Sequence, residues 1–175
     1  CIGAFKQSHE IGNEIGLKEL KNEILFAGIV ARPERAANTL ERFQIEADDV
    51  RTTAIRVVSV KRFNFRDDIK TNPDPPKGNG ALPFADETKA TLSRACEIAD
   101  GMESQLVRSE HVLLALLGYN NGEKIITSPV IDVLSGLEAV KKGKTKVSVF
   151  DFCEQLVNAL PNTPFVQPGA VRREN

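Results

Sequence analysis

Apolar residues recur along this chain at intervals of three and four positions, the spacing of one helix face. Between residues 84 and 102 they form a single stripe, which predicts an amphipathic helix. Two shorter segments, 23–30 and 110–117, are apolar almost throughout, which is typical of buried helices. Asn22 and Ser109 precede these segments and are residue types favoured at helix N-caps. We therefore expect Asn22 and Ser109 to cap the two helices.

Further helices are expected in the second half of each apolar series. One should begin at Pro33 and another at residues 128–129, because proline is favoured at the first helical position. The apolar spacing within 50–58 and 152–160 predicts one more helix in each place. Residues 54–65 are also rich in valine and phenylalanine, which favour strands. We prefer a helix there and keep a strand as the alternative.

The chain repeats its own apolar pattern. A shift of 87 positions aligns residues 4–30 with residues 91–117 without a gap, and places Glu23 on Glu110. This duplication predicts an all-α fold of two four-helix repeats related by a pseudo-twofold axis. The expected division of the single domain is repeat one at 1–65, a linker at 66–82, repeat two at 83–160 and an extended tail at 161–175.

The first repeat is expected to be cut short. Repeat two has a helix start at residues 82–87, and its counterpart in repeat one would precede Cys1. The sequence begins with cysteine rather than methionine and carries no signal-type apolar segment. Either a targeting peptide has been removed, or the natural N-terminus lies before this sequence.

Composition excludes several classes of partner. The 175 residues include 23 Lys and Arg against 24 Asp and Glu, so the basic excess that attracts nucleic acid or anionic membrane is lacking. The longest apolar run, 112–117, is far below the roughly 20 residues that span a bilayer. Cys1, Cys96 and Cys153 show no disulfide or metal spacing, and Cys96 is interpreted as a packed thiol. We expect a soluble protein of a reducing compartment.

Motifs for catalysis are incomplete. Residues 143–145 read Gly-Lys-Thr, but a Walker A loop needs a glycine five positions earlier, where Glu138 stands. Residues 109–111 read Ser-Glu-His, yet adjacent residues on a helix point in different directions. His9 and His111 are the only histidines, and neither has zinc-type spacing. We therefore expect no enzymatic activity, no cofactor and no metal.

The repeated motifs resemble the Clp N-terminal domain, also called the Clp R domain, which precedes the ATPase modules of ClpC- and ClpA-type unfoldases. Repeat two carries the family pattern at Pro83-Phe84 and at 109–117, and repeat one carries it more weakly at Ile15-Gly16 and 22–30. The histidine that follows Leu-Gly in the family is absent from both repeats. The resemblance covers residues 4–160 and implies a recognition domain without its motor, or a fragment of a larger unfoldase.

Glu23 and Glu110 are the candidate binding residues. A carboxylate in the first turn of a helix can simply interact with the helix dipole. The resemblance implies a second role, because in ClpC-type domains this glutamate holds the guanidinium of a phosphorylated arginine in a client protein. A carboxylate can accept two parallel N–H bonds from guanidinium, and the N–H groups at a helix start suit the phosphate. Asn22 departs from the family pattern and makes repeat one the weaker expected site.

The resemblance implies protein partners. One expectation is an adaptor or accessory subunit of a Clp chaperone–protease system. The alternative is a structural subunit of a larger plastid complex, such as a photosynthetic one, that has recruited the fold. The similarity to stand-alone plastid accessory proteins favours the plastid stroma, with a bacterial cytoplasm as the alternative. Phe165 and Val166 in the tail are expected to dock, either on their own domain or on a partner.

Overall fold

The described part of the chain is built from helices. The computed structural model describes residues 2–32, 35–64, 80–119, 128–137, 153 and 157–158. Within these residues no strand is formed, which agrees with the predicted all-α class. The helices are α1 (Ile2–Glu14), α2 (Asn22–Val30), α3 (Arg35–Arg42), α4 (Ala47–Asn64), α5 (Asp86–Gly101), α6 (Ser109–Leu116) and α7 (Ile131–Gly136).

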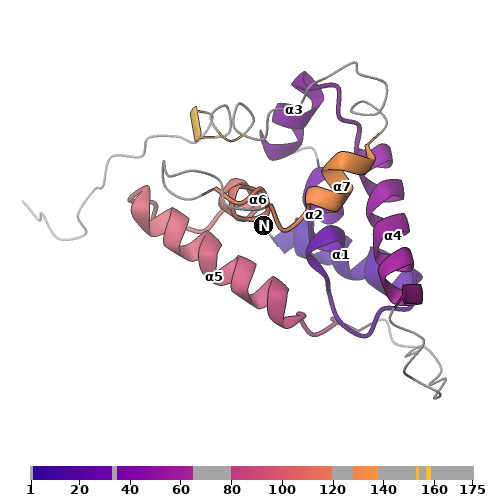
Figure 1. Cartoon of the computed structure of the whole chain (residues 1–175). Coiled ribbons are helices and arrows are strands. Elements are labelled where there is room, and N and C mark those ends of the chain that lie inside the picture. The colour runs from indigo at the N-terminus through magenta and orange to yellow at the C-terminus, as the bar shows by residue number, and fades with distance from the viewer. Residues whose placement is uncertain are drawn as a thin grey trace, which may run out of the picture.

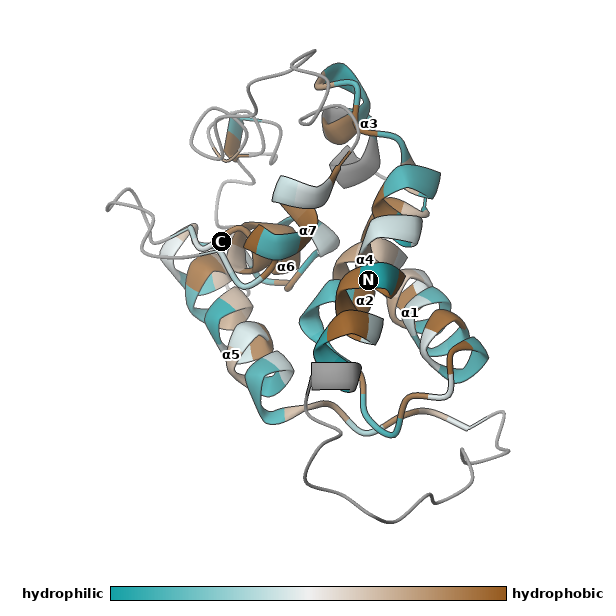
Figure 2. Ribbon diagram, turned by 45° about the vertical axis from the view of Figure 1, so that its right-hand side comes forward, coloured by the Kyte–Doolittle hydropathy of each residue, from teal (hydrophilic) through white to brown (hydrophobic). Residues whose placement is uncertain are grey.

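Helices α2 and α6 form the centre of the molecule and contact each other (Figure 1). Every residue of both helices is buried, as their continuous apolar sequences predict. Helix α1 packs on α2 and helix α5 packs on α6, while α3 contacts both central helices. Helix α4 packs against α2 as well, and α7 packs against α4. Figure 2 colours most of α2 brown, whereas brown and teal residues alternate along α4 and α5, as expected for helices with one apolar face.

Helix α4 confirms the helical interpretation of residues 54–64 and rules out the strand there. Its first turn contains Asp48 and Asp49, and its last turn contains Lys61 and Arg62. Acidic residues at a helix start and basic residues at its end both complement the helix dipole. This charge distribution adds to the apolar face and outweighs the strand preference of the valines.

The predicted helix caps are wrong by one residue. Asn22 and Ser109 are the first helical residues, and the extended N-cap positions are Lys21 and Arg108. At α6 the backbone N–H of Arg108 donates to Nδ1 of His111 at 3.0 Å. The histidine ring therefore accepts the backbone N–H of the N-cap residue Arg108, and Ser109 is the first residue of the helix.

The third helix of the second predicted repeat begins later than expected, whereas the predicted start in the first repeat is not tested. Pro33 lies outside the described residues, and α3 starts at Arg35. In the second half α7 starts at Ile131, because Ser128 forms a turn of its own. Its Oγ accepts from the N–H of Val130 at 3.2 Å and donates to the carbonyl of Leu116 at 2.8 Å.

The start of the second half is fastened to the first half at Leu20. The N–H of Leu20 donates to the Pro83 carbonyl at 2.7 Å, and the N–H of Ala85 donates to the Leu20 carbonyl at 3.0 Å. The Leu20 carbonyl also accepts from Oγ1 of Thr88 at 2.9 Å. These bonds form an isolated parallel bridge that holds α5 beside the segment leading into α2.

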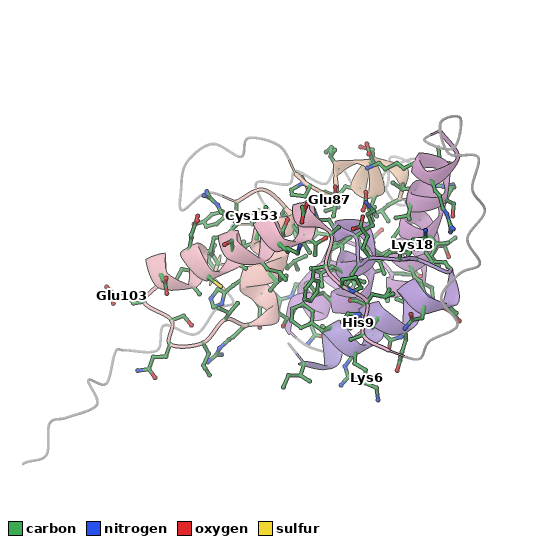
Figure 3. The ribbon with its side chains drawn as sticks, turned by 90° about the horizontal axis from the view of Figure 1, so that it is seen from below. Lys6, His9, Lys18, Glu87, Glu103 and Cys153 are labelled. Carbon is green, nitrogen blue, oxygen red and sulfur yellow. The ribbon has the colours of Figure 1, made fainter. Side chains whose placement is uncertain are left out.

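His9 joins the same contact from α1. Its Nδ1 accepts the N–H of Leu82 at 3.1 Å, and its ring lies 5.9 Å from the ring of Phe84, centroid to centroid. Figure 3 shows His9 among the side chains of the molecule, whereas Lys6 from the same helix points away from them. The contact therefore ties α1 to the segment that precedes α5.

The thiols differ in environment. Cys96 on α5 is exposed, so the prediction of a packed thiol is wrong. The buried positions of α5 include Ala95 and Ala99, and Cys96 lies to one side of the line that they form. Cys153 is buried, and burial raises the pKa of its thiol to about 12.

Several predictions concern residues outside the described part of the chain. These include the Gly-Lys-Thr motif at 143–145 and the tail with Phe165 and Val166. The boundaries of the two repeats and their twofold relation remain predictions.

Candidate functional site

A groove of about 560 Å³ opens where the first turn of α2 meets α4, α5 and the end of α6. This volume is within the range of ligand pockets, roughly 300–1,000 Å³. Its walls carry two carboxylates, two cations and three uncharged polar side chains, from Asn22, Glu23, Lys61, Glu87, Thr91, Arg94 and Tyr119. The groove therefore combines residues of both halves of the chain.

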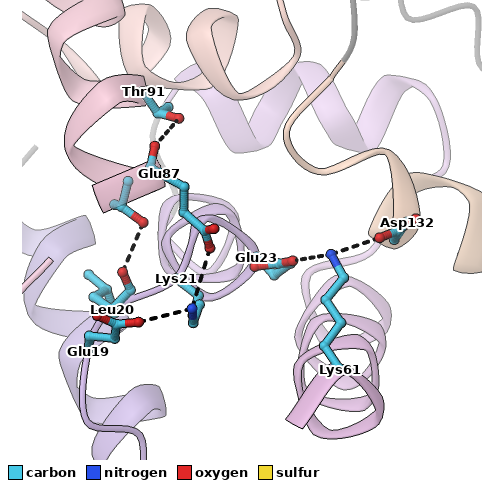
Figure 4. A network of polar contacts seen from close by, with 9 residues as sticks. Glu19, Leu20, Lys21, Glu23, Lys61, Glu87, Thr91 and Asp132 are labelled. Carbon is cyan, nitrogen blue, oxygen red and sulfur yellow. Dashed lines mark hydrogen bonds and ion pairs between the residues drawn. The ribbon is translucent and has the colours of Figure 1, made fainter. Parts of the chain in front are cut away.

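Glu23 is the most buried charged group of the groove. Its side chain is 5% exposed, and Oε1 accepts from Nζ of Lys61 at 2.8 Å (Figure 4). The second oxygen, Oε2, is buried and has no hydrogen-bond partner among the described residues, and the same holds for Oδ1 of Asn22. A buried acceptor without a donor is costly in free energy, about 1–3 kcal/mol. Two acceptor atoms, on consecutive residues that line the groove, thus lack hydrogen-bond donors.

Lys61 connects the groove to α7. Its Nζ lies 2.8 Å from Oε1 of Glu23 and 2.8 Å from Oδ2 of Asp132. Partial burial of Lys61 disfavours its charged form, but the hydrogen bonds with Asp132 and Glu23 outweigh this cost and raise its pKa above the usual value. Lys61 therefore remains an ammonium ion at neutral pH.

A second set of ion pairs lies at the α5 side of the groove. Lys21 Nζ is 3.0 Å from Oε1 of Glu19 and 3.7 Å from Oε1 of Glu87 (Figure 4). Burial lowers the pKa of Lys21, but the neighbouring carboxylates raise it further, so that the net shift is upward. Arg94, further along α5, forms an ion pair with Glu97 on the same helix, with 3.0 Å between Nη1 and Oε2. Cations thus stand on both sides of Glu23.

Glu110 has a different setting, although the sequence aligns it with Glu23. It is buried and does not line this groove. Its Oε2 accepts a hydrogen bond from Oγ of Ser109 at 3.1 Å. The structure therefore does not place the two predicted site residues in one groove, and of these two residues Glu23 alone has a buried oxygen without a partner there.

Sequence reasoning missed Lys61 and Asp132. Lys61 follows Ala54 by seven positions and Val58 by three, so it continues the buried face of α4 where an apolar residue would be expected. A lysine at such a position signals a partner carboxylate. Asp132 gives no such signal, because its role depends on how α7 packs on α4.

The groove offers hydrogen-bonding and ionic contacts. Among the described residues, no group of three His, Cys, Asp or Glu side chains is placed to hold a metal ion. The helices of this part of the chain are too short or too polar to cross a bilayer. Two acceptors, Glu23 Oε2 and Asn22 Oδ1, are available to N–H donors of a ligand once neighbouring side chains move aside, because both atoms are buried.

Comparison with known proteins gives a consistent result. The model of the family described as the Clp repeat (R) N-terminal domain matches residues 2–128. Among solved structures, the chain is similar to the N-terminal domain of the caseinolytic protease associated chaperone ClpD from Arabidopsis thaliana. The two share 18% sequence identity with a TM-score of 0.59, and the match covers 91% of this chain and 94% of the other. No curated protein sequence matches. At this identity the structural likeness shows the fold alone.

Proposed function

The chain belongs to the family of Clp repeat (R) N-terminal domains, which are non-catalytic protein-interaction domains of Clp chaperones, and we propose that it serves as an adaptor or accessory subunit of a Clp chaperone–protease system. In this role it binds client proteins or the protease core. The similar domain of a plant ClpD supports a location in the plastid stroma, with the bacterial cytoplasm as the alternative.

One observation carries the choice of binding site. Glu23 Oε2 and Asn22 Oδ1 are buried, lack donors and belong to residues that line the groove. A basic group of a client would supply the missing N–H donors, and a carboxylate is the acceptor that guanidinium pairs with most strongly. The groove between α2 and α5 is therefore our proposed client site.

Within this site we propose that Glu23 holds the guanidinium of a phosphorylated arginine. The N–H groups at the start of α2 are suited to the phosphate, and Arg94 adds a positive charge on the facing helix. We place Glu110 second, because it does not line the groove and, unlike Glu23, has no buried oxygen that lacks a donor. Asn22, a departure from the family pattern, contributes an additional acceptor in this proposal.

Binding of a short phosphoarginine peptide tests the site. We expect Glu23→Gln to weaken binding about tenfold or more, since a hydrogen bond to a charged group contributes about 1.5–3 kcal/mol. Glu110→Gln should weaken it less. The control is Glu10→Gln, which removes the same charge from an exposed position of α1 outside the groove. Equal affinity of the Glu23→Gln and Glu10→Gln proteins, measured by fluorescence anisotropy, would contradict the assignment.

Affinity purification from the source organism tests the adaptor role. Recovery of Clp protease or chaperone subunits, weakened by Glu23→Gln, supports client or core docking. Recovery of a photosynthetic or other large plastid complex without any Clp subunit would instead identify a structural subunit and overturn the proposal.

A further inference from the structure

Lys61 holds the position that a cationic ligand of Glu23 would need. Its Nζ is 2.8 Å from Glu23 Oε1, and the lysine comes from a helix 38 residues further along the same chain (Figure 4). A ligand that donates to both oxygens of Glu23 therefore competes with the ammonium of Lys61 for Oε1.

Lys61 satisfies only one of the hydrogen-bond acceptors at this end of the groove. Glu23 Oε2 and Asn22 Oδ1 remain without donors although both atoms are buried at the groove. A single ammonium approaches one oxygen, whereas a planar guanidinium presents several N–H groups in a fixed fork. We therefore expect the groove to bind a guanidinium more tightly than a second ammonium. An ammonium would only repeat the contact that Lys61 already makes.

Lys61 also has a second carboxylate within reach. Asp132 Oδ2 lies 2.8 Å from its Nζ, and the Asp132 side chain is 55% exposed on α7. Lys61 itself is 48% exposed at the end of α4. A long, flexible side chain in this setting can give up one carboxylate and keep the other.

We propose that Lys61 is a built-in competitor for the cationic ligand of the groove, and that Asp132 retains its ammonium when the ligand takes Glu23. This inference rests on the proposed function, because it concerns the same groove and names its specificity. The competition sets a threshold: groups that offer one N–H contact fail to displace Lys61, and groups that offer several succeed.

A double-mutant cycle tests the competition with two probes, methylguanidinium and the phosphoarginine peptide. Lys61→Met removes the competitor at similar length, and we expect about fivefold tighter binding. Asp132→Asn removes the alternative partner of the ammonium, and we expect about threefold weaker binding. In the Lys61→Met background the Asp132→Asn change should have almost no effect, because no ammonium remains to be retained.

Lys89→Met is the matched control. Lys89 pairs with Asp86 at 2.8 Å on the exposed side of α5 and does not line the groove, so this change removes the same charge without a competitor. We expect it to alter affinity by less than about 1.5-fold. Unchanged or weaker binding by Lys61→Met overturns the proposal. Additive effects of the Lys61 and Asp132 changes overturn it too, because they indicate a general electrostatic field.

The two probes separate failure of the competition from failure of the proposed function. If the peptide binds no variant, the phosphoarginine assignment is wrong, and methylguanidinium alone then decides the competition. Its binding is followed by NMR at the Asn22 side-chain amide and at the Lys61 Cε carbon. An Asn22 signal that moves at lower methylguanidinium concentration in Lys61→Met than in the unaltered protein supports the competitor; the Lys61 Cε signal is followed in the unaltered protein only. Absence of movement at Asn22 in every variant overturns it.

Discussion

His9 and His111 each accept a hydrogen bond from a backbone N–H through Nδ1, at 3.1 and 3.0 Å. This arrangement requires a ring nitrogen without a proton, so both bonds depend on neutral imidazole. Burial lowers the pKa of both residues; at His111 the nearby Glu110 opposes the shift and Arg108 adds to it. Near the ordinary pKa of histidine, about 6.5, the folded protein therefore binds fewer protons than the unfolded chain.

Protonation of these histidines should destabilise the folded protein. Because the folded pKa values are lowered, the free energy of unfolding should fall as the pH drops below about 6.5, the ordinary value for histidine. We expect a lower urea midpoint at about pH 5.5 than at about pH 7.5. His9→Gln/His111→Gln retains an acceptor without titration and should reduce the difference. Equal midpoints of the unaltered protein at both pH values would refute this account.

At the scale of elements, the contact between α1 and α2 depends on one glycine. A Cβ atom on Gly28 would lie 2.0 Å from Oγ of Ser8, 2.7 Å from the Ser8 nitrogen and 2.8 Å from the Ala4 carbonyl oxygen. Two of these three atoms belong to the backbone, which cannot move without shifting a helix. The aligned position in the second half is Ala115, so the repeat pattern alone would permit alanine at residue 28.

We predict that Gly28→Ala lowers the free energy of unfolding by about 3 kcal/mol, measured by chemical denaturation. Ser8→Ala in the same protein should recover only part of the loss, because the backbone contacts remain. Gly3→Ala is the control on α1, where the added Cβ meets only the movable guanidinium of Arg32 at 2.9 Å. It should change stability by less than about 1 kcal/mol. A Gly28→Ala protein as stable as Gly3→Ala would show that α1 and α2 can separate freely.

At the scale of the whole molecule, the two halves share one core. The buried apolar cluster runs without interruption from α1 and α2 to α6 and α7. Leu82, which precedes the second half, is buried against the first half: its Cδ1 is 2.6 Å from the place of a Cβ on Gly12. A half of the chain alone would leave such residues exposed.

A single cooperative unfolding transition is the expected consequence. Tyr119, the only tyrosine, reports by fluorescence on the second half, while far-UV circular dichroism reports on all helices. The two signals should coincide. Leu82→Ala should lower the free energy of unfolding by about 2–5 kcal/mol and keep the transition single. Two separable transitions in the unaltered protein would mean that the halves fold independently.

The sequence by itself determined the class of structure, the helix positions and the family. The apolar spacing in α4 and α5 and the continuous apolar segments of α2 and α6 are local properties, and a local period is enough to define a helix and its buried face. The family resemblance rested on these same segments and is confirmed by the family-model match over residues 2–128.

The tertiary structure alone decided the groove, the pairing of Lys61 with both Glu23 and Asp132, and the difference between Glu23 and Glu110. The groove and the ion pairs of Lys61 depend on side chains from separate helices that meet at hydrogen-bond distance, which no local period encodes. The same reason explains the exposed Cys96: it lies at the edge of the apolar stripe of α5, and only the neighbouring helices determine which edge positions are covered.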